Sequence, residues 1–154
     1  MKNNKKKKTS LTPEAIHQQT LKGTEKYKEL SFFEQFAMYI GVVQLLEICL
    51  KNLLAEKYKY DLDKLEKWTL GRTAKELEKN NLRKDFTQIL NSVVEYRNYI
   101  AHEMLANEIL FHELSKGSIP KNYYTREMRR LHGAIYELER LFFLFNWTRK
   151  NEAW

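Results

Sequence analysis

The chain has 154 residues, of which 43% are hydrophobic, 13% aromatic and 31% charged, as is typical of one globular domain with a sizeable core. A single cysteine, Cys49, excludes an intrachain disulfide framework and fits a reducing, cytoplasmic compartment. The net charge of +7 is concentrated, because five lysines within residues 1–8 leave only +2 for the remainder. The folded part is therefore only mildly basic, and net charge alone is weak evidence for a nucleic-acid partner.

The amino terminus is predicted to be a disordered basic tail over residues 1–9, followed by a single domain over residues 10–150. The lysines could hold phosphate groups without reading sequence, or could simply be solvated. No apolar run follows them within the first 30 residues, which argues against a signal peptide. No stretch approaches 18 uninterrupted apolar residues, so no contact with a membrane is expected.

The next part of the chain carries two helix starts. Thr12 can cap a helix that has Pro13 at its first position. Ser31, with Glu34 three residues later, matches a capping box and predicts a strong helix ending near Tyr58. Five glycines and two prolines in the whole chain also favour long helices over a turn-rich β architecture.

One acidic residue interrupts the predicted apolar stripe of the second helix. The stripe advances in steps of four and three residues: Phe36, Ile40, Val43, Glu47, Leu50 and Leu54. A carboxylate among core residues is costly unless a partner satisfies it, and Lys51 lies one turn later. Glu47 and Lys51 are therefore either a surface pair at the edge of the stripe or part of a site.

The rest of the chain is predicted to be helical with short interruptions. We expect a connection with one helical turn over 58–71, a short helix over 73–80, a long helix over 82–114, a loop over 116–120 and a last helix over 122–147. The last helix carries a seven-residue repeat of apolar side chains: Tyr124, Met128, Leu131, Ile135, Leu138, Phe142 and Phe145. The predicted fold is a small all-α bundle of four to five helices.

The long helix over 82–114 has two contrasting faces. A polar stripe consists of Asn91, Glu95, Asn98 and His102. A neighbouring stripe consists of Leu90, Val94, Arg97 and Ala101, which places an arginine among apolar residues. A cation there needs a partner or an anionic ligand. Because an unbroken helix would approach about 50 Å, a bend after His102 is expected.

The run from Arg97 to His102 resembles the Arg-x-x-x-x-His motif of the HEPN superfamily. The run from Glu47 to Asn52 is similar to a Glu-x-x-x-Lys-Asn signature of the same family, and the resemblance covers roughly residues 30–148. The resemblance implies a HEPN-like helical bundle, RNA as substrate, a homodimer that pairs two motifs, and a role in toxin–antitoxin or phage-defence systems. A cognate antitoxin would be a partner in the toxin case. Glu47 and Lys51 would then face Arg97 and His102 across a helix–helix groove.

The chemistry of these side chains fits cleavage of RNA by its own 2′-hydroxyl group. A histidine such as His102 can act as base or acid near neutral pH. The guanidinium of Arg97 offers a fixed fork of donors to a phosphate, and Asn98 could orient the His102 ring or bind a phosphate oxygen. The histidines are far apart in sequence and no cysteine pair exists, so we expect neither a metal site nor a cofactor.

Three matters stay open in the sequence. In a toxin subgroup that the motif resembles, the sequence continues as His-x-Tyr and the tyrosine is modified, but this chain has Met104 there. A basic group near the start of the last helix, Arg126, Arg129 and Arg130, could be a solvated face or could touch RNA phosphates. The rivals to an endoribonuclease are a non-catalytic module that binds a nucleotide or RNA, and a helical protein-interaction domain.

Overall fold

The computed structural model describes residues 11–114, 116 and 121–154, and the secondary structure of this part is helical, without a strand. The prediction of a small all-α bundle is confirmed. The helices are α1 (Pro13–Thr24), a 3₁₀ turn η1 (Glu25–Tyr27), α2 (Phe32–Tyr58), α3 (Leu62–Glu66), α4 (Leu70–Lys79), α5 (Lys84–Tyr99), a π-helical segment η2 (Ile100–Met104), α6 (Leu105–Leu114) and α7 (Lys121–Asn151). The predicted basic tail and most of the predicted loop after α6 lie outside the described residues.

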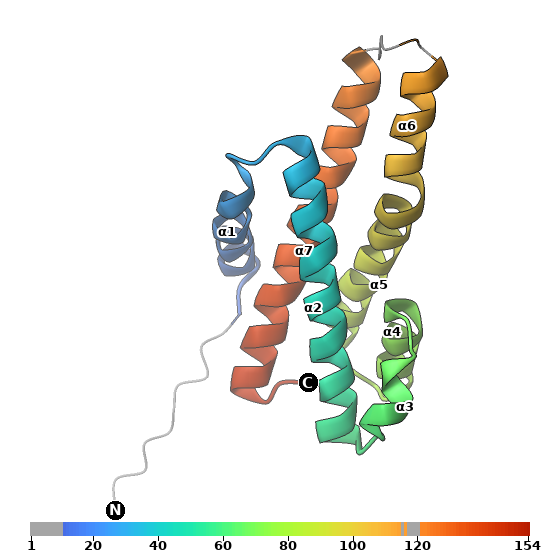
Figure 1. Ribbon diagram of the computed structural model, residues 1–154. Coiled ribbons are helices and arrows are strands. Elements are labelled where there is room, and N and C mark those ends of the chain that lie inside the picture. The colour runs from blue at the N-terminus through green and yellow to red at the C-terminus, as the bar shows by residue number, and fades with distance from the viewer. Residues whose placement is uncertain (1–10, 115, 117–120) are drawn as a thin grey trace, which may run out of the picture.

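The long helix α7 is the centre of the bundle. It packs against α1, α2 and α5, while α4 covers α5 and the short α3 packs on α2 (Figure 1). The core contains fully buried side chains from each of the long helices, among them Tyr39, Leu50, Phe86, Leu90 and Leu138. The α6 helix and the start of α7 extend beyond the first turn of α2 (Figure 1).

The two predicted caps are present. The Thr12 hydroxyl accepts a hydrogen bond from the Ala15 amide at 3.2 Å. In the capping box, the Ser31 amide donates to the Glu34 carboxylate at 2.7 Å, and the Glu34 amide donates back to the Ser31 hydroxyl at 3.4 Å. These bonds satisfy amide groups that have no partner inside the helix and so fix where α1 and α2 begin.

The buried face of α2 differs from the predicted stripe. Tyr39 and Leu46 are fully buried, whereas Phe36, Ile40 and Glu47 are only half-buried. Val43, Leu50 and Leu54 of the predicted stripe are buried as expected, so the core side is turned from the predicted side by less than the roughly 100° of one residue. The first half of α2 is apolar nearly all round, so more than one stripe with helical spacing can be drawn through it.

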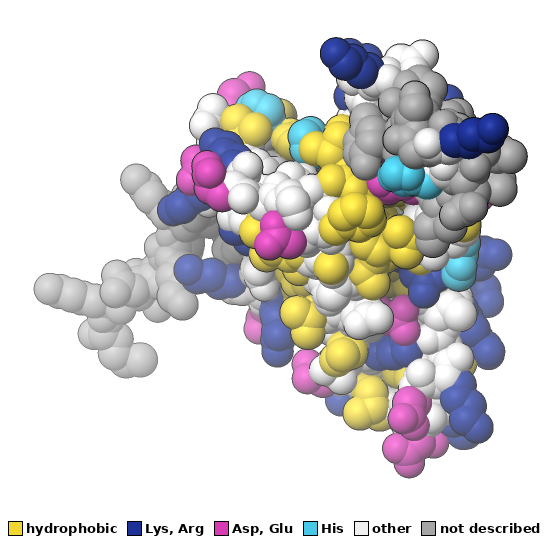
Figure 2. Space-filling view, turned by 45° about the horizontal axis from the view of Figure 1, so that its top comes forward, with side chains coloured by type: hydrophobic (Ala, Val, Ile, Leu, Met, Phe, Trp, Pro, Cys, Tyr) yellow, Lys and Arg dark blue, Asp and Glu magenta, His cyan; other side chains and the backbone are white. Residues whose placement is uncertain are grey.

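The other sides of α2 leave apolar side chains exposed. Phe33, Leu45 and Ile48 are each more than half exposed, at 54%, 58% and 55%. Figure 2 shows hydrophobic side chains gathered along the face on which α2 lies. By length and composition α2 could cross a membrane, with a mean hydropathy of 1.5 over its most apolar 18 residues, of which 33% are buried. The search of the sequence for 18 uninterrupted apolar residues did not identify α2, because a few polar residues interrupt its apolar run.

Candidate functional site

The Arg97–His102 motif spans the junction between α5 and a π-helical segment. Arg97 lies in the last turn of α5, and His102 lies in η2. In a continuous α-helix, five residues would leave His102 about 140° around the axis from Arg97. The wider π turn advances by a smaller angle per residue and brings His102 back toward the face of Arg97. Short π segments in helices are frequent at functional sites, and this one interrupts the long helix where a bend was predicted.

The side chains of Arg97, Asn98 and His102 differ in solvent exposure. His102 and Asn98 are exposed, as are Asn91 and Glu95, so the predicted polar stripe faces solvent. Arg97 is half-buried, and its Nη1 donates to Asn98 Oδ1 at 3.2 Å. Asn98 therefore positions the guanidinium of Arg97, and its amide NH₂ group can still donate to a phosphate oxygen.

Arg97 is close enough to Tyr39 of α2 for its charge to affect the Tyr39 hydroxyl. Burial raises the pKa of Tyr39 well above its usual range, the nearby Tyr96 adds to the rise, and the Arg97 guanidinium opposes it. Gly133 of α7 allows the close approach of Tyr96, because a Cβ at that position would lie 3.1 Å from the Tyr96 hydroxyl oxygen. The half-buried Arg97 thus lies near a buried aromatic side chain.

A groove runs along the seam between α5 and α7, beside the polar stripe. It has a volume of about 410 Å³ and is lined by Ser92, Glu95, Tyr96, Tyr99 and Arg130. The Arg130 guanidinium carbon lies 4.5 Å from the centre of the Tyr99 ring. The groove shares Glu95 with the polar stripe, so an extended ligand that lay in the groove would also pass close to that stripe.

A buried carboxylate that the sequence reasoning missed organises this groove. Glu127 is 2% exposed and accepts a hydrogen bond from the Tyr99 hydroxyl at 2.8 Å. Its other oxygen lies 3.3 Å from Arg126 Nε and 3.5 Å from Arg130 Nη1. Burial, and then the Glu127 carboxylate, raises the pKa of Tyr99, so its hydroxyl stays protonated as a donor. The sequence did contain a signal for this carboxylate, because Glu127 stands among the apolar positions of α7, four residues before Leu131.

Glu47 and Lys51 form the predicted pair, on another part of α2. Lys51 Nζ donates to Glu47 Oε1 at 2.7 Å and to the backbone oxygen of Glu66 at 3.1 Å. Within the described part of the chain, no hydrogen bond or ion pair joins this pair to Arg97 or His102. Its observed contact braces α2 against the end of α3.

Replacing Glu47 with Ala is expected to lower the free energy of unfolding by about 1–3 kcal/mol, because Lys51 would keep a charge that is 89% buried with only one acceptor. Thermal unfolding followed by circular dichroism would measure the change. Glu56→Ala is the matched control, because Glu56 is exposed on the same helix and should stay within about 0.5 kcal/mol.

The other residues considered in the sequence have plainer surroundings. Met104 is fully buried, so the position of the modified tyrosine in the toxin subgroup belongs to the core here. His112 is exposed on α6, and His17 Nδ1 lies 2.7 Å from the Tyr136 hydroxyl oxygen. No group of three or more His, Cys, Asp or Glu side chains that could hold a metal ion occurs in the residues described.

Comparison with protein-family models, with curated proteins and with solved structures gave no match.

Proposed function

We propose that this chain is a HEPN-type, metal-independent endoribonuclease acting in a toxin or phage-defence role. The observation that carries the proposal is the pairing of Arg97, fixed by Asn98 at the end of α5, with an exposed His102 in the π segment that follows. A guanidinium that can stabilise negative charge and a solvent-accessible imidazole that can transfer a proton are the groups that this phosphodiester chemistry requires.

The proposed reaction uses the 2′-hydroxyl group of the RNA as nucleophile. The 2′-oxygen attacks the adjacent phosphorus as its proton passes to a base, and the bond to the 5′-oxygen of the next nucleotide breaks as that oxygen gains a proton. His102 serves as base or acid, and Arg97 stabilises the charge that develops on the phosphorane oxygens. The products are a 2′,3′-cyclic phosphate and a 5′-hydroxyl end.

The groove between α5 and α7 supports RNA as the substrate. Tyr99 offers an aromatic face, and Arg130 lies over it with its charge only partly balanced by Glu127. Aromatic faces and guanidinium groups are the common means of holding single-stranded nucleic acid. All three arginines of this part of α7 are exposed, and Arg126 and Arg130 also pair with Glu127.

The proposed active form is a homodimer, because each chain supplies one His102 and the reaction needs both a base and an acid. The exposed side of α2 is the proposed interface, with Phe33, Leu45 and Ile48 around the smaller Ala37 and Gly41. When two α2 helices cross in antiparallel fashion at Gly41, Leu45 of each copy lies against Ala37 of the other. This match of large to small residues is what a symmetric, self-complementary contact requires.

The direct test is incubation of the pure protein with total RNA and with a matched DNA, in excess chelator. We expect RNA to be cleaved to cyclic-phosphate and 5′-hydroxyl ends and DNA, which lacks the 2′-hydroxyl, to survive. Magnesium-dependent cleavage or 5′-phosphate ends would contradict the mechanism. Binding of RNA without cleavage would favour the non-catalytic binding module instead.

Replacing Arg97 with Lys is expected to leave cleavage well below the wild-type rate, because a point charge does not reproduce the two parallel donors of a guanidinium. The same change also removes the bond to Asn98, so the cation would be less well positioned. Initial rates on a defined RNA would measure the effect. Arg129→Lys, an exposed arginine on α7, is the control, and equal rates for the two variants would argue against a role for Arg97.

A further inference from the structure

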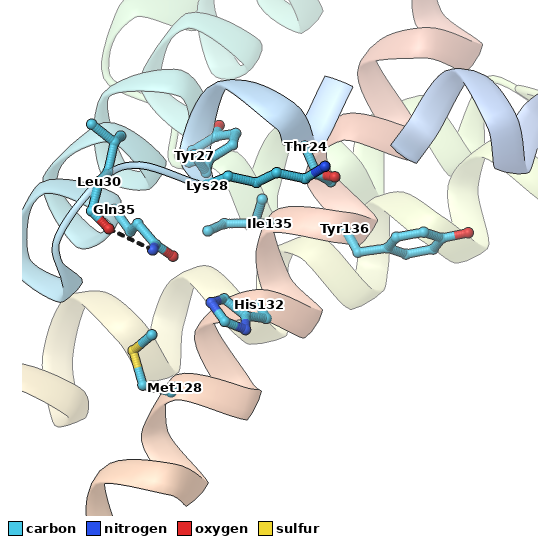
Figure 3. A pocket seen from close by; sticks show the side chains of 9 residues that line it. All are labelled: Thr24, Tyr27, Lys28, Leu30, Gln35, Met128, His132, Ile135 and Tyr136. Carbon is cyan, nitrogen blue, oxygen red and sulfur yellow. Dashed lines mark hydrogen bonds between the residues drawn. The ribbon is translucent and has the colours of Figure 1, made fainter. Parts of the chain in front are cut away.

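A cavity separate from the motif opens between η1, the start of α2 and the middle of α7 (Figure 3). Its volume is about 520 Å³, within the roughly 300–1,000 Å³ of small-molecule sites. None of the residues that line it belongs to the Arg97–His102 motif or to the groove between α5 and α7. It therefore calls for a separate explanation.

A buried polar side chain in the lining of the cavity has an unused hydrogen-bond acceptor. Gln35 is 5% exposed, and its Nε2 donates to the backbone oxygen of Leu30 at 2.9 Å. Since only the NH₂ group can donate to a carbonyl, this bond fixes which end of the amide carries the oxygen. Gln35 Oε1 is buried without a hydrogen-bond partner in the described structure, and Figure 3 shows it directed into the cavity. A ligand with an N–H or O–H donor would satisfy it.

The walls of the cavity are mainly apolar and come from two sides. Leu30 lies on one side, and Ile135 and Met128 of α7 lie on the other, with the Tyr27 ring between them (Figure 3). The Tyr27 hydroxyl is already engaged, because it donates to Glu139 Oε1 at 3.0 Å. The ring of Tyr27 and the aliphatic side chains thus present surfaces suited to the faces of a planar ring.

The mouth of the cavity can hold an anion. Lys28 and His132 reach it from opposite sides, and both side chains are exposed. Lys28 Nζ has an acidic neighbour only at 3.8 Å, Glu25 Oε1, and both members of that pair are about two-thirds exposed. Such a pair is weak and easily exchanged for a ligand. The nearest buried acid, Glu139, is already paired with Lys26 at 2.7 Å.

We infer that this cavity binds a small anionic heterocycle, of the chemistry of a nucleoside monophosphate. A ring N–H or amino group bonds to Gln35 Oε1, the ring lies between Leu30 and Ile135, and the phosphate meets Lys28 and His132. The inference does not rest on the proposed nuclease activity, because the cavity and the motif share no residue.

The test is calorimetric titration of the full chain with AMP, GMP, CMP and UMP and with the corresponding nucleosides, without RNA. At least one mononucleotide should bind with a Kd below about 1 mM, and its nucleoside at least several-fold more weakly. Gln35→Leu should weaken binding by roughly three- to tenfold, the usual worth of one hydrogen bond. Lys28→Ala should weaken it and reduce its salt dependence, whereas Lys22→Ala, an exposed lysine of α1, should not.

A second variant keeps the inference testable if the Gln35→Leu protein fails to fold. Met128→Trp enlarges a half-buried side chain on the cavity wall and should abolish binding while RNA cleavage is kept. The inference is overturned if no mononucleotide binds at 5 mM, a concentration about five times the expected limit, or if Met128→Trp binds as the wild type does. Equal affinity for nucleoside and mononucleotide would overturn the role of Lys28 and His132. Loss of cleavage in His102→Ala with unchanged mononucleotide affinity would separate the two sites.

Discussion

Replacing His102 with Ala is expected to lower RNA cleavage by roughly 10²–10⁴-fold, the usual worth of a positioned acid–base group. The side chain is exposed in the π segment and forms no hydrogen bond in the described structure, so its removal should leave packing intact. The expected change in unfolding free energy is within about 0.5 kcal/mol. Single-turnover cleavage of a defined RNA, with melting curves of both proteins, measures the two effects separately.

The control for this experiment is His112→Ala. His112 is also exposed, and it lies on α6 one helix beyond the motif. A general effect of removing a surface histidine would appear in both variants, whereas a chemical role appears only at His102. Full activity in His102→Ala would remove the nuclease proposal and leave the binding module as the better explanation.

The helices themselves were largely predictable because their ends carry local signals. Thr12, Ser31 and Glu34 satisfy amides close to them in the chain, so their effect can be recognised without knowing the fold. The buried side of α2 was not predictable, because Phe36 and Tyr39 fit equally regular stripes. Which of them enters the core depends in part on α7, which packs against α2 and lies far from it in the sequence.

The candidate site was predictable as a set of residues but not as a geometry. The polar stripe through Asn98 and His102 does face solvent. The π segment, however, has no signal in the pattern, because Ile100 and Met104 are four residues apart and would both enter the core from a regular α-helix as well. Likewise, the hydrogen bond between Glu127 and Tyr99 of α5 joins residues 28 positions apart, so the sequence pattern around Glu127 could not predict it.

Replacing Gly41 with Leu is expected to stabilise the fold of the single chain but to weaken its self-association through the exposed face of α2. Gly41 is exposed inside α2, and a Cβ there would have no atom within 4 Å. In the isolated chain, Leu should raise the free energy of unfolding by up to about 1 kcal/mol, because glycine is a poor helix former. In the proposed dimer, the added side chain keeps two α2 helices from approaching, so self-association should weaken.

These opposite signs make the experiment decisive. Light scattering at micromolar concentration should report a dimer for the wild type and a monomer for Gly41→Leu, while melting at high dilution shows the variant to be at least as stable. RNA cleavage is measured on the same samples, and a fall that accompanies loss of the dimer would tie the α2 interface to activity. Leu21→Glu, which alters an apolar side chain 42% exposed on α1, should leave both mass and cleavage unchanged. A Gly41→Leu protein that stays dimeric would move the interface away from α2, and a fully active monomer would show that one His102 suffices.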